Sequence, residues 1–107
     1  MSILIKLRTP TELASYEGCA LAMTLATFGQ PVQLYLDAAV FNILMNPKSR
    51  LFGMMQSLDL YDMPKAWLPA DVFSGWVLGM LPQDLAAQLT LEPEVINGND
   101  FSQILTF

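Results

Sequence analysis

Short apolar blocks alternate along the chain with longer segments in which apolar residues recur at helical spacing. The blocks that have the length and composition of strands lie at residues 2–7, 32–36, 65–68, 94–96 and 103–107. The intervening segments predict helices over residues 10–28, 38–45, 49–58, 71–78 and 82–89. Strands that alternate with helices are typical of parallel βαβ units. We therefore predict a single α/β domain over residues 1–107, a three-layer α/β/α sandwich with a mostly parallel sheet of about five strands.

The first predicted helix carries clear start and stop signals. Thr9 can cap it, Pro10 suits the first helical position, and Glu12 completes a capping box. Gly29 marks its end. Its apolar residues cover so wide an arc that burial on more than one side is expected for Leu13, Tyr16, Ala20, Leu21, Met23, Leu25 and Phe28.

The composition indicates that this domain associates with other subunits. Hydrophobic residues make up 53% of the chain and charged residues only 14%, whereas an average globular domain has about 25% charged residues. So few charges leave apolar surface uncovered, and obligate interfaces between subunits are apolar in the same way. Oligomerisation is therefore expected.

Charge and hydropathy argue against nucleic-acid binding, a membrane-spanning segment and a signal peptide. The net charge is −5 and only five residues are basic, which is a poor basis for direct binding of nucleic acid. The longest apolar stretches, residues 18–29 and 72–81, fall short of the roughly 18–20 residues that span a bilayer. Charged residues from Lys6 to Glu17 leave no apolar core for a signal peptide. A soluble, cytoplasmic protein is expected.

The sequence offers few groups for catalysis. It contains one cysteine, Cys19, and no histidine, which excludes an internal disulfide and Ser-His or Cys-His catalysis. The commonest metal ligand is missing, and neither a metal nor a cofactor is predicted. Cys19 lies deep in the first helix between small apolar residues, which favours a buried thiol, with a reactive thiol as the alternative. No catalytic residue is assigned.

Two groups of residues are candidates for binding. Thr9, Asp37 and Asp71 fall at strand ends or helix starts and predict a strand-end crevice; helix capping is the favoured alternative for the two aspartates. Aromatic and methionine side chains predict a subunit interface with the candidates Tyr61, Trp67, Phe73, Trp76 and Met80. Packing in the core or in a turn is the alternative for the two tryptophans and for the tyrosine.

Several short motifs, taken in order, resemble the DsrE/DsrF-like family and its TusC/DsrF branch in particular. The motifs are Tyr16-Glu17-Gly18, Asp37-Ala38-Ala39-Val40-Phe41, Leu58-Asp59-Leu60-Tyr61-Asp62 with the following Trp67, and Ile104-Leu105-Thr106-Phe107. They span nearly the whole chain. The chain departs from the branch pattern where it lacks a glycine after Asp37 and where Pro69-Ala70-Asp71 follows the third predicted strand.

The resemblance implies a non-carrying subunit of a sulfur-relay complex of the TusBCD or DsrEFH type. Its partners would be TusB- and TusD-like subunits, and the relay would serve thiouridine formation at the tRNA wobble position or related sulfur transfer. The carrier cysteine of such complexes belongs to the TusD/DsrE subunit; the matching position here, near Leu68 or Pro69, has no sulfur. Two alternatives stay open: a small thiol sulfurtransferase that uses Cys19, and a homo-oligomeric DsrE/F-like protein that binds a small ligand.

Overall fold

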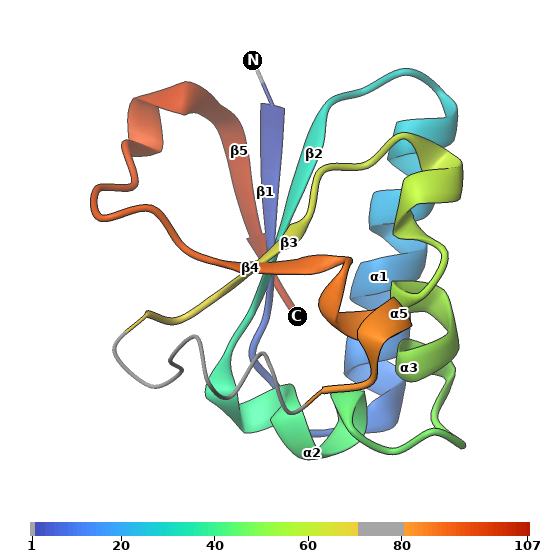
Figure 1. Cartoon of the computed structure of the whole chain (residues 1–107). Helices are drawn as coiled ribbons and strands as arrows, with labels where there is room; N and C mark the ends of the chain where they lie inside the picture. Colours follow the sequence, from blue (N-terminus) through green and yellow to red (C-terminus); the bar gives the residue numbers. More distant parts are fainter. Residues whose placement is uncertain (1, 71–80) are drawn as a thin grey trace.

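The computed structural model describes residues 2–70 and 81–107 (Figure 1). The strands are β1 (Ser2–Leu7), β2 (Val32–Leu36), β3 (Ala66–Leu68), β4 (Leu89–Leu91) and β5 (Phe101–Thr106). The α-helices are α1 (Glu12–Thr27), α2 (Phe41–Leu44), α3 (Arg50–Met55) and α5 (Gln83–Ala86). Three 3-10 turns complete the elements of the described ranges: η1 (Ala38–Val40), η2 (Leu58–Tyr61) and η3 (Gly98–Asp100).

The five strands form one parallel sheet in the order β4-β3-β2-β1-β5. In Figure 1 α1, α3 and α5 lie on one face of this sheet, and the connection from β4 to β5 crosses to the other side. The predicted fold class is confirmed: the protein is α/β, with a parallel sheet flanked by helices that is compatible with a three-layer α/β/α sandwich. Within the described residues, no helix is both long and apolar enough to cross a membrane.

The core forms between the central strands and α1. Ile5 and Leu7 of β1 and Leu34 and Leu36 of β2 are fully buried and belong to one apolar cluster. The residues on both sides of Trp67 in β3 belong to this cluster. Because successive side chains of a strand point to opposite faces of the sheet, Trp67 points away from the cluster. The bounds of β1 and β2 agree with the sequence prediction because both strands are almost continuously apolar.

Small residues, rather than the wide apolar arc, form the buried side of α1. Its buried residues are Ser15, Gly18, Cys19, Ala22 and Met23, whereas Leu13 and Phe28 are 65% and 83% exposed. An added Cβ at Gly18 would clash with Leu7 and would lie 3.0 Å from the ring of Phe107. The expected burial of Leu13 and Phe28 is therefore wrong, because α1 approaches the sheet along its narrow, small-residue stripe.

Several predicted element bounds are also corrected. No strand forms at residues 94–96; β4 lies earlier, where Leu89 and Leu91 alternate with Thr90 and pair in register with β3. The predicted helix over residues 38–45 divides into η1 and α2, and the one over residues 49–58 ends at Met55 before η2 begins. The helix predicted over residues 71–78 lies outside the described residues.

Candidate protein-interaction site

The carboxyl ends of β1 and β2 bring Arg8 and Asp37 together in an ion pair. The Arg8 Nε donates to a carboxylate oxygen of Asp37 at 3.0 Å. The other oxygen of Asp37 accepts from the N–H of Ala39 at 3.4 Å and so caps η1. The favoured capping role of Asp37 is confirmed, and both of its oxygens are engaged. Asp71, the third member of the predicted crevice, lies outside the described residues.

Thr9 lies at the same end of the sheet but does not cap the first helix. The backbone N–H groups of Arg8 and Thr9 both donate to the carbonyl oxygen of Phe107, at 2.7 and 3.0 Å. This long-range connection holds the chain beside β5, and the helix begins only after Thr11, whose hydroxyl oxygen accepts from the N–H of Ala14 at 3.3 Å. The prediction that Thr9 is the cap is therefore wrong.

The only thiol of the chain is sealed inside the fold. Cys19 is fully buried in the cluster between α1 and the sheet, and this burial raises the pKa of its thiol to about 12. A thiol of that pKa is protonated at neutral pH, and the thiolate is the nucleophilic form. At the end of β3, where the carrier position would fall, Leu68 and Pro69 are themselves buried.

A groove on the outer side of the helices is one candidate for binding. Two cavities, of about 270 and 340 Å³, share Tyr16 of α1 and Arg50 of α3. Leu13 lines the first, and Met54 and Tyr61 line the second. We call these two neighbouring cavities together, with Leu13, Tyr16, Arg50, Met54 and Tyr61 among their lining residues, the helix groove.

Side-chain contacts between α1 and α3 shape the helix groove. The Arg50 guanidinium lies over the Tyr16 ring, 5.0 Å from its centroid. The backbone N–H of Arg50 donates to the carboxylate of Glu12 at 3.0 Å. Glu12 therefore adds a hydrogen bond at the start of α3, where Ser49 is the cap, instead of completing a capping box in its own helix as the sequence predicted. These contacts leave the Arg50 side chain exposed at the surface, over the ring of Tyr16.

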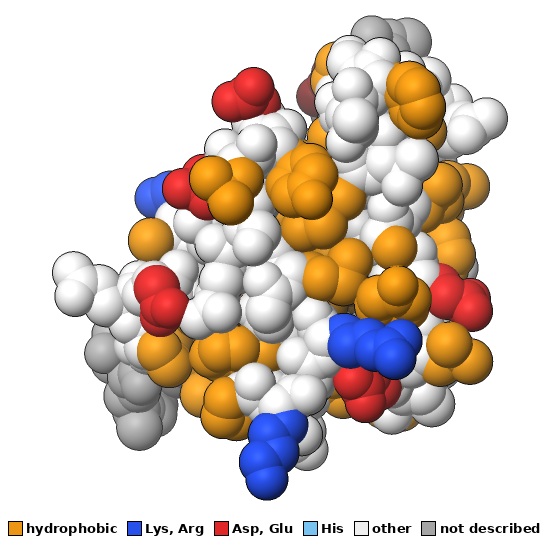
Figure 2. All heavy atoms as spheres, turned by 90° about the vertical axis from the view of Figure 1, so that its right-hand side faces the viewer, with side chains coloured by type: hydrophobic (Ala, Val, Ile, Leu, Met, Phe, Trp, Pro, Cys, Tyr) orange, Lys and Arg blue, Asp and Glu red, His pale blue; other side chains and the backbone are white. Residues whose placement is uncertain are grey.

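Leu13 and Tyr61, which line this groove, and Leu60, which precedes Tyr61 in η2, remain exposed. Leu60 is 79% exposed, Leu13 65% and Tyr61 41%. Figure 2 shows apolar side chains gathered in several places across this face of the molecule. Exposed apolar surface next to aromatic, methionine and arginine side chains is typical of protein–protein interfaces. The helix groove therefore has the chemistry of a site that binds another protein.

Of the predicted interface residues, the two that the structure describes, Tyr61 and Trp67, lie apart. Tyr61 lies in η2 and lines the helix groove. Trp67 points to the opposite face of the sheet, where its ring meets that of Phe101 edge to face at 6.2 Å, and it is half-buried. Phe73, Trp76 and Met80 lie outside the described residues.

The sequence prediction did not include Leu13 and Leu60 among the interface candidates. The usable signal was the width of the apolar arc in α1, which exceeds what one face of a sheet can cover. For Leu60 the signal was the pattern Leu58-Asp59-Leu60-Tyr61, in which only Leu58 turns inward. Both signals indicate excess apolar surface on the helix side of the sheet.

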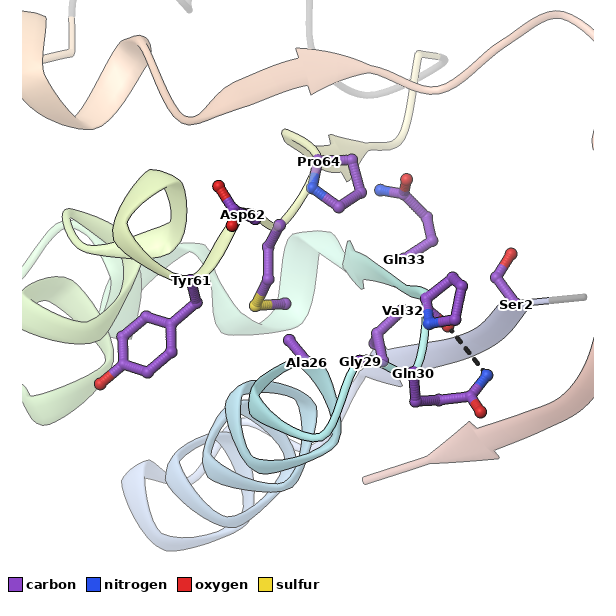
Figure 3. Close-up of a pocket in the computed structure, with 11 residues that line it drawn as sticks. Ser2, Ala26, Gly29, Gln30, Val32, Gln33, Tyr61, Asp62 and Pro64 are labelled. Carbon is purple, nitrogen blue, oxygen red and sulfur yellow. Dashed lines mark hydrogen bonds between the residues drawn. The ribbon is translucent and has the colours of Figure 1, made fainter.

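A further cavity of about 400 Å³ lies at the amino ends of β1 and β2, opposite the predicted crevice (Figure 3). The Gln33 side chain on its wall is buried, and its amide donates to the carbonyl oxygens of Leu34 and Lys65 at 2.9 and 2.8 Å. The Tyr61 ring points away from Gln33 and Ser2 in this view. The amide donors of this wall are therefore occupied within the chain.

Comparison with known proteins leaves the family open. No protein-family model matches the chain, and no curated protein matches it either. Within the described residues, no group of three or more cysteine and carboxylate side chains could hold a metal ion. The site is therefore interpreted from its own chemistry, which is that of an apolar and aromatic groove with one exposed cation.

Proposed function

We propose that the chain is a non-carrying subunit of a cytoplasmic sulfur-relay complex, similar in role to the TusC/DsrF subunit. One observation carries the proposal: the single thiol is sealed under α1, while the outer side of α1 and α3 presents an apolar groove to the surface. A chain built in this way supplies a surface for partners and leaves sulfur chemistry to them.

The arrangement of the family-like motifs supports this role. Asp37 and the residues that follow it form the junction between β2 and η1, and Leu58-Asp59-Leu60-Tyr61 forms η2 ahead of β3. Two of the resembling stretches thus lie next to the central strands, and one of them contributes Tyr61 to the helix groove. The partners proposed for this groove are TusB- and TusD-like subunits.

In this proposal the TusD-like partner carries the persulfide. The end of β3 offers the buried side chains of Leu68 and Pro69 where a carrier would present its cysteine. The relay as a whole delivers sulfur toward thiouridine at the tRNA wobble position or toward a related acceptor. This chain itself contacts neither RNA nor free sulfur donors, since its contribution is the subunit interface.

Co-expression with the TusB- and TusD-like proteins of the same cell, followed by native mass measurement, tests the proposal. The expected result is a complex that contains all three chains. Leu60→Asp should release the partners because it places a charge on an exposed apolar residue next to Tyr61 of the helix groove. Val95→Asp is the matched control, since Val95 is exposed to the same degree, 80% against 79%, and lies between β4 and β5.

Two results would overturn the proposal. The first is a chain that never associates with the TusB- and TusD-like proteins, although all three are folded. The second is stoichiometric uptake of sulfur on Cys19 when the native chain meets a persulfidated donor, detected by intact mass. The second result would favour the sulfurtransferase alternative.

A further inference from the structure

The outer edge of β5 has the features of a strand that pairs with another strand. β5 lies at one end of the strand order, and no other described strand pairs with its outer edge. The opposite edge of the sheet, β4, has only three residues and is followed closely by Pro93. Short strands and nearby prolines are common protections of sheet edges. β5, with six residues, has neither protection.

The hydrogen bonds of β5 show which backbone groups face outward. The N–H of Phe107 donates to the carbonyl oxygen of Lys6, and the carbonyl oxygen of Phe107 accepts from Arg8. In a parallel ladder, alternate residues direct both backbone groups to the same neighbour. Leu105 therefore also faces β1, whereas the N–H and C=O groups of Ile104 and Thr106 face outward.

The side chains along this edge are suited to a second copy of the same chain. Residues 101–107 carry no charge, although the whole chain has a net charge of −5. Two copies that approach along this strand therefore avoid the like-charge repulsion that other approaches would bring. Ile104 is 49% exposed, so an apolar side chain is available at the contact.

We infer that β5 pairs with β5 of a second copy, antiparallel, around a two-fold axis close to Leu105. In this register Ile104 lies opposite Thr106 of the other copy, and the reverse pairing follows by symmetry. The outward N–H and C=O groups of these two residues then bond to each other in both pairs, which joins the two sheets into one of ten strands. The contact is independent of the proposed function, because it involves none of the helix-groove residues.

Sedimentation combined with amide hydrogen exchange tests this contact on the full chain. The native protein is expected to be a dimer at about 10 µM and to dissociate on dilution. Exchange at the amides of Ile104 and Thr106 should be at least about tenfold slower in the dimer than in the monomer. The amides of Leu105 and Phe107 should be protected in both, because they bond to β1.

Two variants separate this contact from other kinds of self-association. Ile104→Lys should give a folded monomer, whereas Val95→Lys, which adds the same charge at another exposed position, should leave the dimer intact. Thr106→Pro removes one outward N–H and leaves the bonds of Phe107 to β1, and it should also give a monomer. A native chain that is monomeric at all concentrations, or a dimer that survives both edge substitutions, would overturn the inference.

Discussion

Cys19 packs against the sheet from the inner side of α1, in a stripe of small residues that brings the helix close to β1. Burial at this position raises the pKa of the thiol to about 12 and removes it from reagents in solution. The same packing that stabilises the contact between α1 and the sheet therefore makes the only sulfur nucleophile of the chain inert in the native state.

This burial predicts a loss of stability at high pH. The unfolded thiol titrates near 9.0 and the folded one near 12, so above pH 9 the unfolded chain releases a proton that the folded chain keeps. The contribution of Cys19 is fully present below that pH and is lost at roughly 1.4 kcal/mol per pH unit as the pH rises toward the folded pKa. Chemical denaturation of the native chain and of Cys19→Ala across this range measures the difference.

The alanine variant corrects for the other groups that titrate at high pH, because it retains all of them. An unfolding free energy that falls in parallel for both proteins would contradict the buried position of the thiol. A second readout is the rate of reaction with a thiol reagent at neutral pH, which should be slow until denaturant unfolds the chain.

Gly18 provides a second prediction at the residue scale. Gly18→Ala places a methyl group against Leu7 and Phe107, and overpacking of this kind costs about 1–3 kcal/mol of unfolding free energy. The higher helix propensity of alanine offsets about 0.8–1 kcal/mol of that cost, because Gly18 lies within α1. Gly53→Ala is the matched control, because nothing lies within 4 Å of its added Cβ and alanine favours a helix by about 0.8–1 kcal/mol. Thermal unfolding should therefore show opposite shifts for the two substitutions; a stabilised Gly18→Ala protein would contradict the close packing.

At the scale of single residues, the sequence predicted what depends on near neighbours. The burial of Cys19 followed from its small apolar flanks, and the capping role of Asp37 followed from its place after a strand. The cap of α1 did not follow, because Thr9 is held by the carbonyl oxygen of Phe107, a contact across nearly the whole chain. Local capping signals contain no information about such a contact.

Among the elements, α1 and α3 are joined by the side chain of Glu12, for which the local sequence pattern predicted a capping box within its own helix. Glu12 accepts from the N–H of Arg50, 38 residues away in the sequence, and so adds to the cap that Ser49 provides for α3. Glu12→Ala should lower the unfolding free energy by about 0.3–1 kcal/mol, as loss of an exposed acidic group at a helix N-terminus does, and should speed amide exchange in α3. Glu17→Ala, an exposed glutamate of the same helix, is the control and should have little effect on either measurement.

Element prediction succeeded where burial is complete and failed near the sheet edge. β1 and β2 are buried on both faces or nearly so, and a continuous apolar run is a strong signal for such strands. β4 is a three-residue edge strand directly after α5, and its Leu-Thr-Leu pattern also fits the end of a helix. The pairing of β4 with β3 makes this segment a strand and not the end of a helix. No local sequence pattern indicates that pairing.

On the scale of the whole molecule, part of the excess of apolar residues lies at two separate surfaces. The helix groove lies on the outer side of α1 and α3, and the free edge of β5 lies at one end of the sheet. The sequence predicted that apolar surface would be shared with other subunits. The sequence could not show which residues form these surfaces, because the exposure of Leu13, Leu60 and Ile104 depends on how distant segments pack.

If both surfaces act as proposed, a complex should contain two copies of this chain, each bound to its own TusB- and TusD-like partners. Ile104→Lys should then halve the mass of the complex and keep the partners bound, because it removes only the contact between the two copies. Leu60→Asp should release the partners and leave a dimer of this chain. Distant sites without shared partners act independently, so the double variant should be a folded monomer. Native mass measurement of the four proteins checks this, and partner loss in Ile104→Lys alone would show that the two surfaces are coupled.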